Sequence, residues 1–130
     1  YGCGGIAAVW QQRKLGLADN WLQPIRDVAH LYREPLLKLP NDESRMDRLC
    51  ELNVLVQARR VCRTTIVQQA WDAGRALTVH AWVYRLGDGL LRDLGFCASS
   101  LADAEADYAR AAGVGTIGDD GQPFLAGPAA

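Results

Sequence analysis

Tyr1-Gly2-Cys3-Gly4-Gly5 opens the chain and runs directly into the apolar segment Ile6–Trp10. A glycine-flanked cysteine before an apolar run predicts a loop that feeds a helix, because glycines adopt backbone angles closed to other residues. The positive end of that helix's dipole would favour the thiolate of Cys3, the form that binds a metal or attacks an electrophile. The alternative is a small apolar cysteine packed beneath the helix start, since free cysteine is among the most buried residue types. The local sequence leaves both interpretations open.

The other three cysteines are widely spaced along the chain: Cys50, Cys62 and Cys97. Without a secretory signal, this spacing predicts reduced thiols rather than a disulfide framework. Neither a Cys-x-x-Cys pair nor a pair of closely spaced histidines is present, so a metal site built wholly within the chain is not expected. Cys50 and Cys62 lie about 120° apart around the axis of one expected helix and cannot converge on one ion.

Composition narrows the class of protein. The 130 residues form one domain at most. A content of 49% apolar and 22% charged residues is ordinary for a soluble globular protein, and the net charge of −1 gives no electrostatic reason to expect nucleic acid. No apolar run approaches the roughly 20 residues needed to cross a bilayer. We therefore expect a cytoplasmic protein, with neither nucleic acid nor a membrane as partner.

Helical patterns dominate the first half of the chain. The first helix is expected from about Gly4 to Arg13, ending at the Leu15-Gly16 break. A second helix begins near Leu17, with Pro24 tolerated in its first turn. Four of its residues recur at helical spacing and would form a buried stripe: Trp21, Ile25, Val28 and Ala29.

A long helix follows, with Asn41 or Asp42 as its cap. Its apolar face is broad enough for burial on more than one side. Asn53 lies within that face, and because a buried amide needs hydrogen-bond partners, we expect it to contact another element or subunit. The apolar members of the face are Met46, Leu49, Leu52, Val56 and Val61, widened by Leu55 and Ala58.

Two shorter helices are expected downstream. Thr65 and Gln68 have the form of a capping box, and they would start a helix through Trp71 that ends at Gly74. Ser99 or Ser100 would cap a last helix through Ala112, closed by Gly113. The glycine- and proline-rich residues 113–130 predict a flexible tail.

Strand signals lie between these two helices. Residues Leu77–Tyr84 alternate, and both alternating sets are bulky or apolar, which predicts a strand covered on both faces and parallel to a neighbour that this sequence does not contain. After the turn Gly87-Asp88-Gly89, residues Leu90–Leu94 would return as an antiparallel edge strand. His80 is a metal-ligand type, but its position brings no second ligand, and a hydrogen-bonded core histidine is the commoner case.

Several segments, in order and with similar spacing from Tyr1 to about Leu94, resemble the C-terminal two thirds of a β-class carbonic anhydrase: Leu52–Gln57, Thr65–Trp71, Val79–Tyr84 and Asp88–Leu94. The opening is similar to the zinc motif of that family, His-x-x-Cys-Gly-Gly/Ala, from its second residue onward. The resemblance implies an α/β fold of three layers around a central, mostly parallel sheet, here truncated and dominated by helices. Residues 1–112 would be the C-terminal part of that domain. Two strands are too few to bury both faces of a sheet, so we expect the N-terminal third to be truncated or supplied by another chain.

The resemblance also implies a function: zinc-dependent, reversible hydration of carbon dioxide to bicarbonate by a homodimer or homotetramer. In that family two cysteines and a histidine hold Zn²⁺, which lowers the pKa of a bound water towards neutrality. Cys3 matches the second cysteine ligand, and Gly4 and Gly5 match the segment that shapes the substrate pocket. The Cys-x-Asp-x-Arg motif that supplies the first cysteine has no counterpart. With one ligand of four, the isolated chain is expected to bind zinc weakly or not at all and to be inactive.

Other functions stay open. The broad apolar face around Asn53 would suit a non-catalytic dimerising or interaction module derived from the family. A thiol-dependent activity at Cys3 would need a base, and no histidine is spaced to serve. Tyr84 matches a tyrosine that contributes to a non-catalytic bicarbonate site in some members, although a core or interface tyrosine is the simpler interpretation. Val56 stands where the family more often has glutamate.

Overall fold

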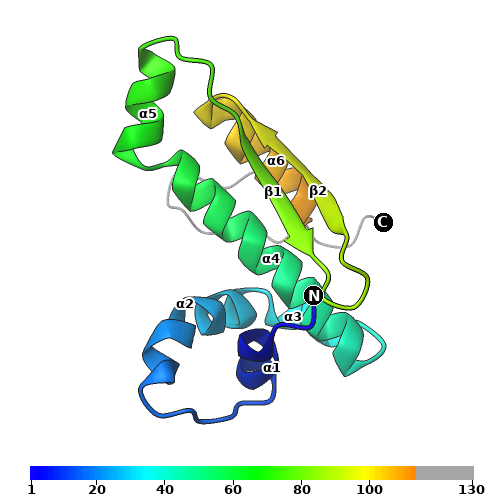
Figure 1. Cartoon of the computed structure of the whole chain (residues 1–130). Helices are drawn as coiled ribbons and strands as arrows, with labels where there is room; N and C mark the ends of the chain where they lie inside the picture. The colour runs from blue at the N-terminus through cyan, green and yellow to red at the C-terminus, as the bar shows by residue number, and fades with distance from the viewer. Residues whose placement is uncertain (114–130) are drawn as a thin grey trace. The chain divides into compact units, whose positions relative to one another are not determined.

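The computed structural model of the chain describes residues 1–113, shown in Figure 1. Within them, the elements follow the order α1 (Gly4–Trp10), α2 (Ala18–Leu31), α3 (Arg33–Leu37), α4 (Asp42–Cys62), α5 (Thr65–Asp72), β1 (Val79–Tyr84), β2 (Leu91–Ala98) and α6 (Leu101–Ala112). β1 and β2 pair as a two-stranded hairpin. The expected mixture of helix and sheet, with helices in the majority, is confirmed. The expected flexible tail lies, from residue 114 on, outside the described residues.

The chain divides into two compact units. The first unit comprises Tyr1–Val54 and Val83–Arg92, and the second comprises Leu55–Trp82 and the described residues from Asp93 on. Helix α4 and both strands contribute residues to each unit. The candidate site at Cys3 therefore belongs to the first unit.

Helix α1 ends earlier than the sequence predicts. Gln12 adopts a left-handed conformation with φ of 54°, and its N–H donates to the Val9 carbonyl at 3.1 Å. The Arg13 N–H donates to the Ala8 carbonyl at 2.9 Å, which completes a Schellman motif. The predicted end near Arg13 and Gly16 is wrong because a glutamine, rather than a glycine, takes the left-handed position.

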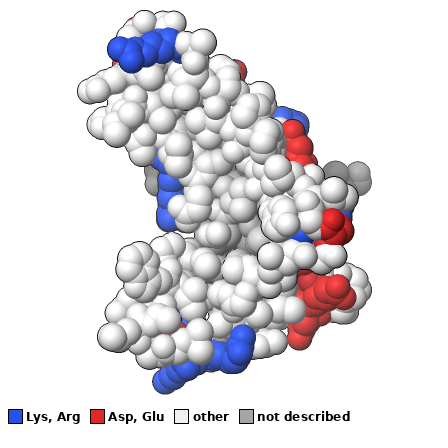
Figure 2. Space-filling model, viewed as in Figure 1, with Lys and Arg blue, Asp and Glu red and all other residues white. Residues whose placement is uncertain are grey.

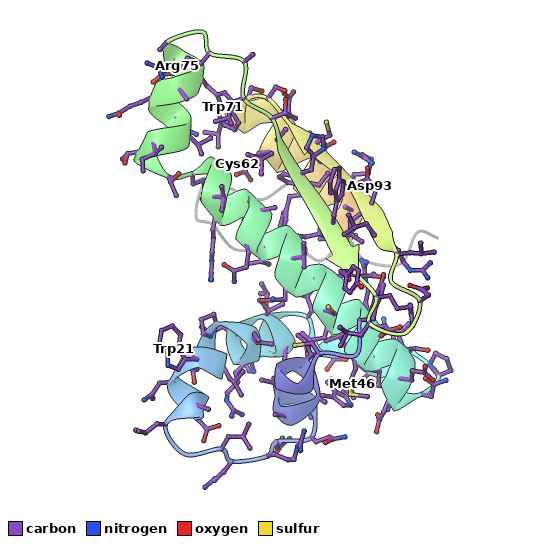
Figure 3. The ribbon with its side chains drawn as sticks, viewed as in Figure 1. Trp21, Met46, Cys62, Trp71, Arg75 and Asp93 are labelled. Carbon is purple, nitrogen blue, oxygen red and sulfur yellow. The ribbon has the colours of Figure 1, made fainter. Side chains whose placement is uncertain are left out.

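Helix α2 buries a different stripe from the one expected. Val28 is buried, but the Trp21 side chain, labelled in Figure 3, is 87% exposed. Leu22 lies on the side of α2 that faces α1, because a Cβ on Gly5 would come within 3.1 Å of Leu22 Cδ2. The preceding residue, Trp21, lies about 100° further around the helix and so points away from α1. Pro24 lies inside the helix rather than in its first turn. The predictions for Trp21 and Pro24 are both wrong.

Helix α4 largely follows its predicted pattern. The Asn41 side-chain oxygen accepts a hydrogen bond from the Ser44 N–H at 2.8 Å, which confirms the cap. The buried positions are Leu49, Leu52, Leu55, Ala58 and Cys62. Val61 is 46% exposed and was wrongly placed on the buried face. The Asn53 Oδ1 atom is buried and has no hydrogen-bond partner within the described residues, so the contact expected for it is not made there.

The hairpin is covered on one face. Ala81 and Val83 of β1 are buried, while Trp82 and Tyr84 on the opposite side are about half exposed. The prediction of a strand covered on both faces is therefore wrong for the described residues. His80 is exposed, with its ring 5.2 Å from that of Trp82, so it is not a core histidine.

Strand β2 continues four residues beyond its predicted end at Leu94. Side chains of α6 hold this extension in place. The Cys97 N–H donates to Asp107 Oδ2 at 2.8 Å, and Arg110 Nη2 donates to the Gly95 carbonyl at 2.8 Å. The extension depends on contacts with a later helix, which a pattern of alternation does not contain.

The caps of the two later helices were predicted with different success. Ser100 accepts a hydrogen bond from the Asp103 N–H, and Gly113 closes α6 with φ of 72°, as expected. Gly74, with φ of 68°, follows the C-cap of α5, also as expected. The capping box of α5 is wrong: its N-cap is Thr64, and the Gln68 amide donates to the Cys62 carbonyl instead.

Glu105 ties α6 to α4 in the second unit. Its carboxylate pairs with Arg59 at 2.7 Å and Arg63 at 2.9 Å. The Arg59 guanidinium also lies over the Tyr108 ring, 4.7 Å from its centroid. Burial alone would raise the pKa of Glu105, but the hydrogen bonds and charges of Arg59 and Arg63 outweigh it, so the pKa lies below its usual value.

We expect Glu105→Gln to lower the free energy of unfolding by about 1 kcal/mol at neutral pH. Because the folded-state pKa lies below the unfolded one, the carboxylate stabilises the fold above the unfolded pKa, about 4.5, and loses this contribution as pH falls further. Urea titrations at pH 7 and at about pH 3.5 measure the difference. The two proteins should be nearer in stability at the lower pH, whereas a matched change at the exposed Glu34, Glu34→Gln, should have little effect at either.

Candidate functional site

Cys3 is the N-cap residue of α1. It has extended backbone angles (φ −69°, ψ 122°), and its carbonyl accepts a hydrogen bond from the Ala7 N–H at 3.1 Å. The residue is exposed, so the interpretation of a cysteine packed beneath the helix is wrong. Its thiol makes no capping hydrogen bond. The thiol therefore stands at the start of the helix, open to a further group.

The two glycines after Cys3 differ in their surroundings. A Cβ on Gly4 would meet no atom of the described chain within 4 Å. A Cβ on Gly5 would meet Leu22 Cδ2 at 3.1 Å and Cys3 Sγ at 3.7 Å. Gly5 thus allows α1 to approach α2 closely and lies near the thiol, while the position of a side chain at Gly4 is open space.

The backbone of Tyr1 is joined to the end of β1. Its nitrogen donates to the Tyr84 carbonyl, and its carbonyl accepts from the Leu86 N–H at 3.4 Å. Two bonds to positions 84 and 86 follow the pattern of a parallel strand pair, although Tyr1 belongs to no strand. On the other side of this segment, the Arg85 N–H donates to the carbonyl of Leu90, the residue before β2.

The Tyr1 side chain is buried against α4. Its hydroxyl donates to Glu51 Oε1 at 2.6 Å, and Arg48 Nη1 donates to the other oxygen of the same carboxylate at 2.8 Å. Burial, followed by the hydrogen bond to Glu51, raises the pKa of Tyr1 to about 12. The phenol therefore keeps its proton and acts as a donor.

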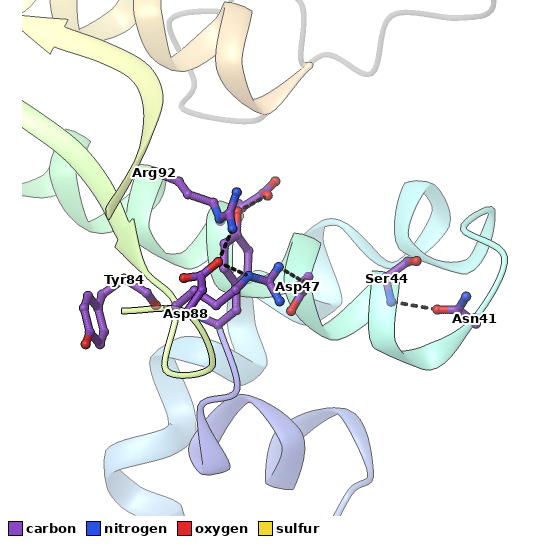
Figure 4. A network of polar contacts seen from close by, with 9 residues as sticks. Asn41, Ser44, Asp47, Tyr84, Asp88 and Arg92 are labelled. Atoms are coloured by element: carbon purple, nitrogen blue, oxygen red, sulfur yellow. Dashed lines mark hydrogen bonds and ion pairs between the residues drawn. The ribbon is translucent and has the colours of Figure 1, made fainter. Parts of the chain in front are cut away.

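Charged side chains surround the Tyr1 ring. Three members of this group, Asp47, Asp88 and Arg92, are labelled in the close view of Figure 4. The Arg85 guanidinium lies 4.4 Å from the ring centroid and pairs with Asp47 at 2.9 Å. The Arg92 guanidinium lies 6.0 Å from the centroid and pairs with Asp88 at 2.5 Å. A hydrogen bond from the Leu90 N–H and the neighbouring Arg92 lower the pKa of Asp88. The group balances three carboxylates against three guanidinium groups, counting Arg48 and Glu51.

Sequence reasoning missed this cluster around Tyr1. The sequence pattern gives Tyr1 no role beyond its place in the motif, and it gives Glu51 and Arg85 none. One signal was available: Asp47 and Glu51 are four residues apart and so share a face of α4. Nothing in the local pattern indicated that this face would meet the start of the chain.

The described residues do not by themselves form a zinc site. Among residues 1–113, no three His, Cys, Asp or Glu side chains are grouped to hold a metal ion. Burial raises the pKa of the Cys50 thiol, and the neighbouring Cys3 and the carboxylates nearby add to this rise. Cys3 is thus one suitable donor in a site that needs about four.

The two histidines and Tyr84 lie apart from any such arrangement within residues 1–113. His30 is an exposed residue in the last turn of α2, and His80 lies on the open face of β1. Tyr84 is 51% exposed, so it is not a core tyrosine of the described chain.

The surface gives two further observations. On the face shown in Figure 2, acidic and basic side chains form small separate groups on a largely uncharged surface. Within the described part of the chain, the helices are too short or too polar to cross a bilayer.

Comparison with known proteins connects these features to a family. The family model described as carbonic anhydrase matches residues 1–91. A carbonic anhydrase of Emericella nidulans is 43% identical over 94 residues, which cover 72% of this chain and 41% of that protein. The chain therefore spans less than half the length of this relative.

Two solved structures of β-carbonic anhydrases are similar to this chain in fold. The β-carbonic anhydrase of Coccomyxa, determined in complex with acetazolamide, has a TM-score of 0.72 and 35% identity, covering 82% of this chain and 48% of its own. One of two tetrameric β-carbonic anhydrases of Sordaria macrospora has a TM-score of 0.68 and 27% identity, covering 75% of this chain and 50% of its own. The chain matches these proteins in sequence and in fold, and it belongs to the β-carbonic anhydrase family.

Proposed function

We propose that this chain is the C-terminal part of a β-carbonic anhydrase domain that catalyses the reversible hydration of carbon dioxide to bicarbonate. Cys3 would be one thiolate ligand of its zinc ion, and Gly4 and Gly5 would lie beside the substrate. The observation that carries the proposal is the exposed Cys3 thiol at the N-terminus of α1, within the segment that matches the family. The open space at Gly4 supports the assignment of that residue to the substrate side, because a substrate needs room there.

The other zinc ligands would come from outside the described residues. Cys3 is a single donor, and the first cysteine ligand and the histidine of the family have no matching positions here. We propose that they are supplied by residues encoded ahead of Tyr1 or by another chain. The 130 residues alone would then bind no zinc and hydrate no carbon dioxide.

The test compares two proteins. One is the product of the complete coding sequence, including whatever is encoded ahead of Tyr1, and the other is residues 1–130 alone. We expect about one zinc per chain and fast hydration, followed by stopped flow with a pH indicator, for the first protein only. Stoichiometric zinc on residues 1–130 would contradict the ligand assignment, and a zinc-free, inactive complete protein would contradict the function.

The complete protein is proposed to be a cytoplasmic homodimer or homotetramer. The tetrameric state of the Sordaria relatives supports assembly. The exposed apolar side chains support it further, since Leu17 and Trp21 are each 87% exposed. Analytical ultracentrifugation of the complete protein tests the oligomeric state.

The same exposed apolar residues favour a second candidate, a non-catalytic dimerising or interaction module derived from the family. The zinc measurement separates the two. A module that lost the site would assemble without zinc, whereas the enzyme would contain it.

A further inference from the structure

We propose that Tyr1 is a positioning residue that holds the Cys3 loop in place within the first unit. The expected effect of this anchor on zinc affinity rests on the function proposed above, whereas the anchoring of the loop does not. The contacts concerned join three parts of the chain: the Tyr1–Cys3 segment, the Asp47–Glu51 face of α4, and the Tyr84–Arg92 hairpin turn.

The backbone supplies the first part of the anchor. The Tyr1 nitrogen donates a hydrogen bond to the Tyr84 carbonyl, and the Tyr1 carbonyl accepts one from the Leu86 N–H. Gly2 alone separates it from Cys3, and two residues of chain span at most about 7 Å. A Cβ on Gly2 would already meet Leu86 Cδ1 at 3.7 Å, so this linking residue also lies against the hairpin turn. The position of the Cys3 backbone therefore depends on that of Tyr1.

The side chain supplies the second part. The Tyr1 hydroxyl donates to Glu51, and the Arg85 guanidinium lies against the ring at 4.4 Å from its centroid. Each of these groups is held in turn, Glu51 by Arg48 and Arg85 by Asp47. A hydrogen bond to a charged acceptor and an arginine on the ring face restrict the ring in two directions.

The thiol needs such an anchor because it has none of its own. Cys3 makes no side-chain capping bond, and the direction of its sulfur is set by its backbone. On its other side, the Cys3 carbonyl is fixed by the Ala7 N–H at 3.1 Å. With Tyr1 released, only the helix side of the loop would remain fixed.

The principal variant is Tyr1→Phe in the complete protein, which removes the hydroxyl but keeps the ring. The matched control is Tyr108→Phe in the second unit, where an arginine guanidinium likewise lies over a buried tyrosine ring. Glu51→Gln is the conservative variant, because an amide oxygen can still accept the bond from the phenol, and Glu51→Ala removes the acceptor. All are first compared with the parent protein by circular dichroism and urea unfolding.

Two readouts are used. The first is hydrogen exchange, after removal of metal by a chelator, in the peptide covering residues 1–10. We expect Tyr1→Phe and Glu51→Ala to raise its exchange rate about fivefold, with Glu51→Gln closer to the parent protein and residues 101–112 unchanged. The second is zinc affinity in competition with a chromophoric chelator, which should fall about tenfold for Tyr1→Phe, as for other residues that orient a metal ligand. Tyr108→Phe should change neither.

The outcomes separate the two proposals. Unchanged exchange at residues 1–10 in a folded Tyr1→Phe protein would overturn the positioning role, as would equal increases in residues 1–10 and 101–112, which indicate a general loss of stability. A complete protein without zinc would overturn the proposed function, and the exchange readout would still decide the role of Tyr1. Raised exchange with unchanged zinc affinity would overturn the link between the anchor and the metal.

Discussion

Replacing Cys3 by serine is expected to remove zinc from the complete protein and to abolish hydration of carbon dioxide. A serine hydroxyl stays protonated near neutral pH and cannot replace a thiolate ligand. Loss of a residue that only orients a ligand costs about 10- to 100-fold in metal affinity or activity, so loss of the ligand itself should exceed about 100-fold in both. Metal analysis by mass spectrometry and stopped-flow hydration measure the two effects.

Cys97→Ser is the matched control for this substitution. Cys97 is also exposed, and the hydrogen bond it makes to Asp107 uses its backbone N–H, which serine retains. We expect its zinc content and rate to equal those of the parent protein. Full zinc occupancy in Cys3→Ser would show that Cys3 is not a ligand and would contradict the proposed zinc site.

Replacing Phe96 by alanine is expected to have the largest effect on stability, about 3–5 kcal/mol. The Phe96 side chain is fully buried in the second unit, with 0% exposure. Its removal loses both the transfer free energy of the ring and the packing of the atoms left around a cavity. Because small domains are stable by only about 5–15 kcal/mol, a loss of this size would remove a large part of the total stability. Urea unfolding followed by tryptophan fluorescence gives the difference.

Leu91→Ala, on the same strand, is the comparison. Leu91 is 60% exposed and should lower the free energy of unfolding by less than about 0.5 kcal/mol. A loss below about 1 kcal/mol for Phe96→Ala would mean that the ring is not enclosed as the structure has it. A large loss for Leu91→Ala would mean that another chain covers that part of β2.

Local signals predicted the ends of several helices well. Asn41 bonds the backbone three residues on, Ser100 does the same for α6, and Gly113 takes the left-handed conformation after it. These bonds lie within one turn, so the residues that make them are neighbours in sequence. Where a residue of another type took the cap, as Gln12 does after α1, the same reasoning failed.

Patterns of burial were predicted less well because they depend on what packs against each face. Helical spacing placed Trp21 with Val28 on one stripe, but contact of Leu22 with α1 rotated the buried face away from Trp21. Alternation in β1 predicted burial on two sides, yet the described residues cover only the side of Ala81 and Val83. Trp82 and Tyr84 are apolar, as the pattern indicates, but each is about half exposed within residues 1–113.

The sequence by itself determined the family of this protein, the position of Cys3 at a helix start, and most of the helix caps. Each of these depends on the order of residues along the chain or on hydrogen bonds within a single turn. The tertiary structure alone decided which side chains are exposed and how the Cys3 loop is held. Tyr1 lies 50 residues from Glu51 and 83 from Tyr84 along the chain, and only the packing of α4 and the hairpin turn brings the three together.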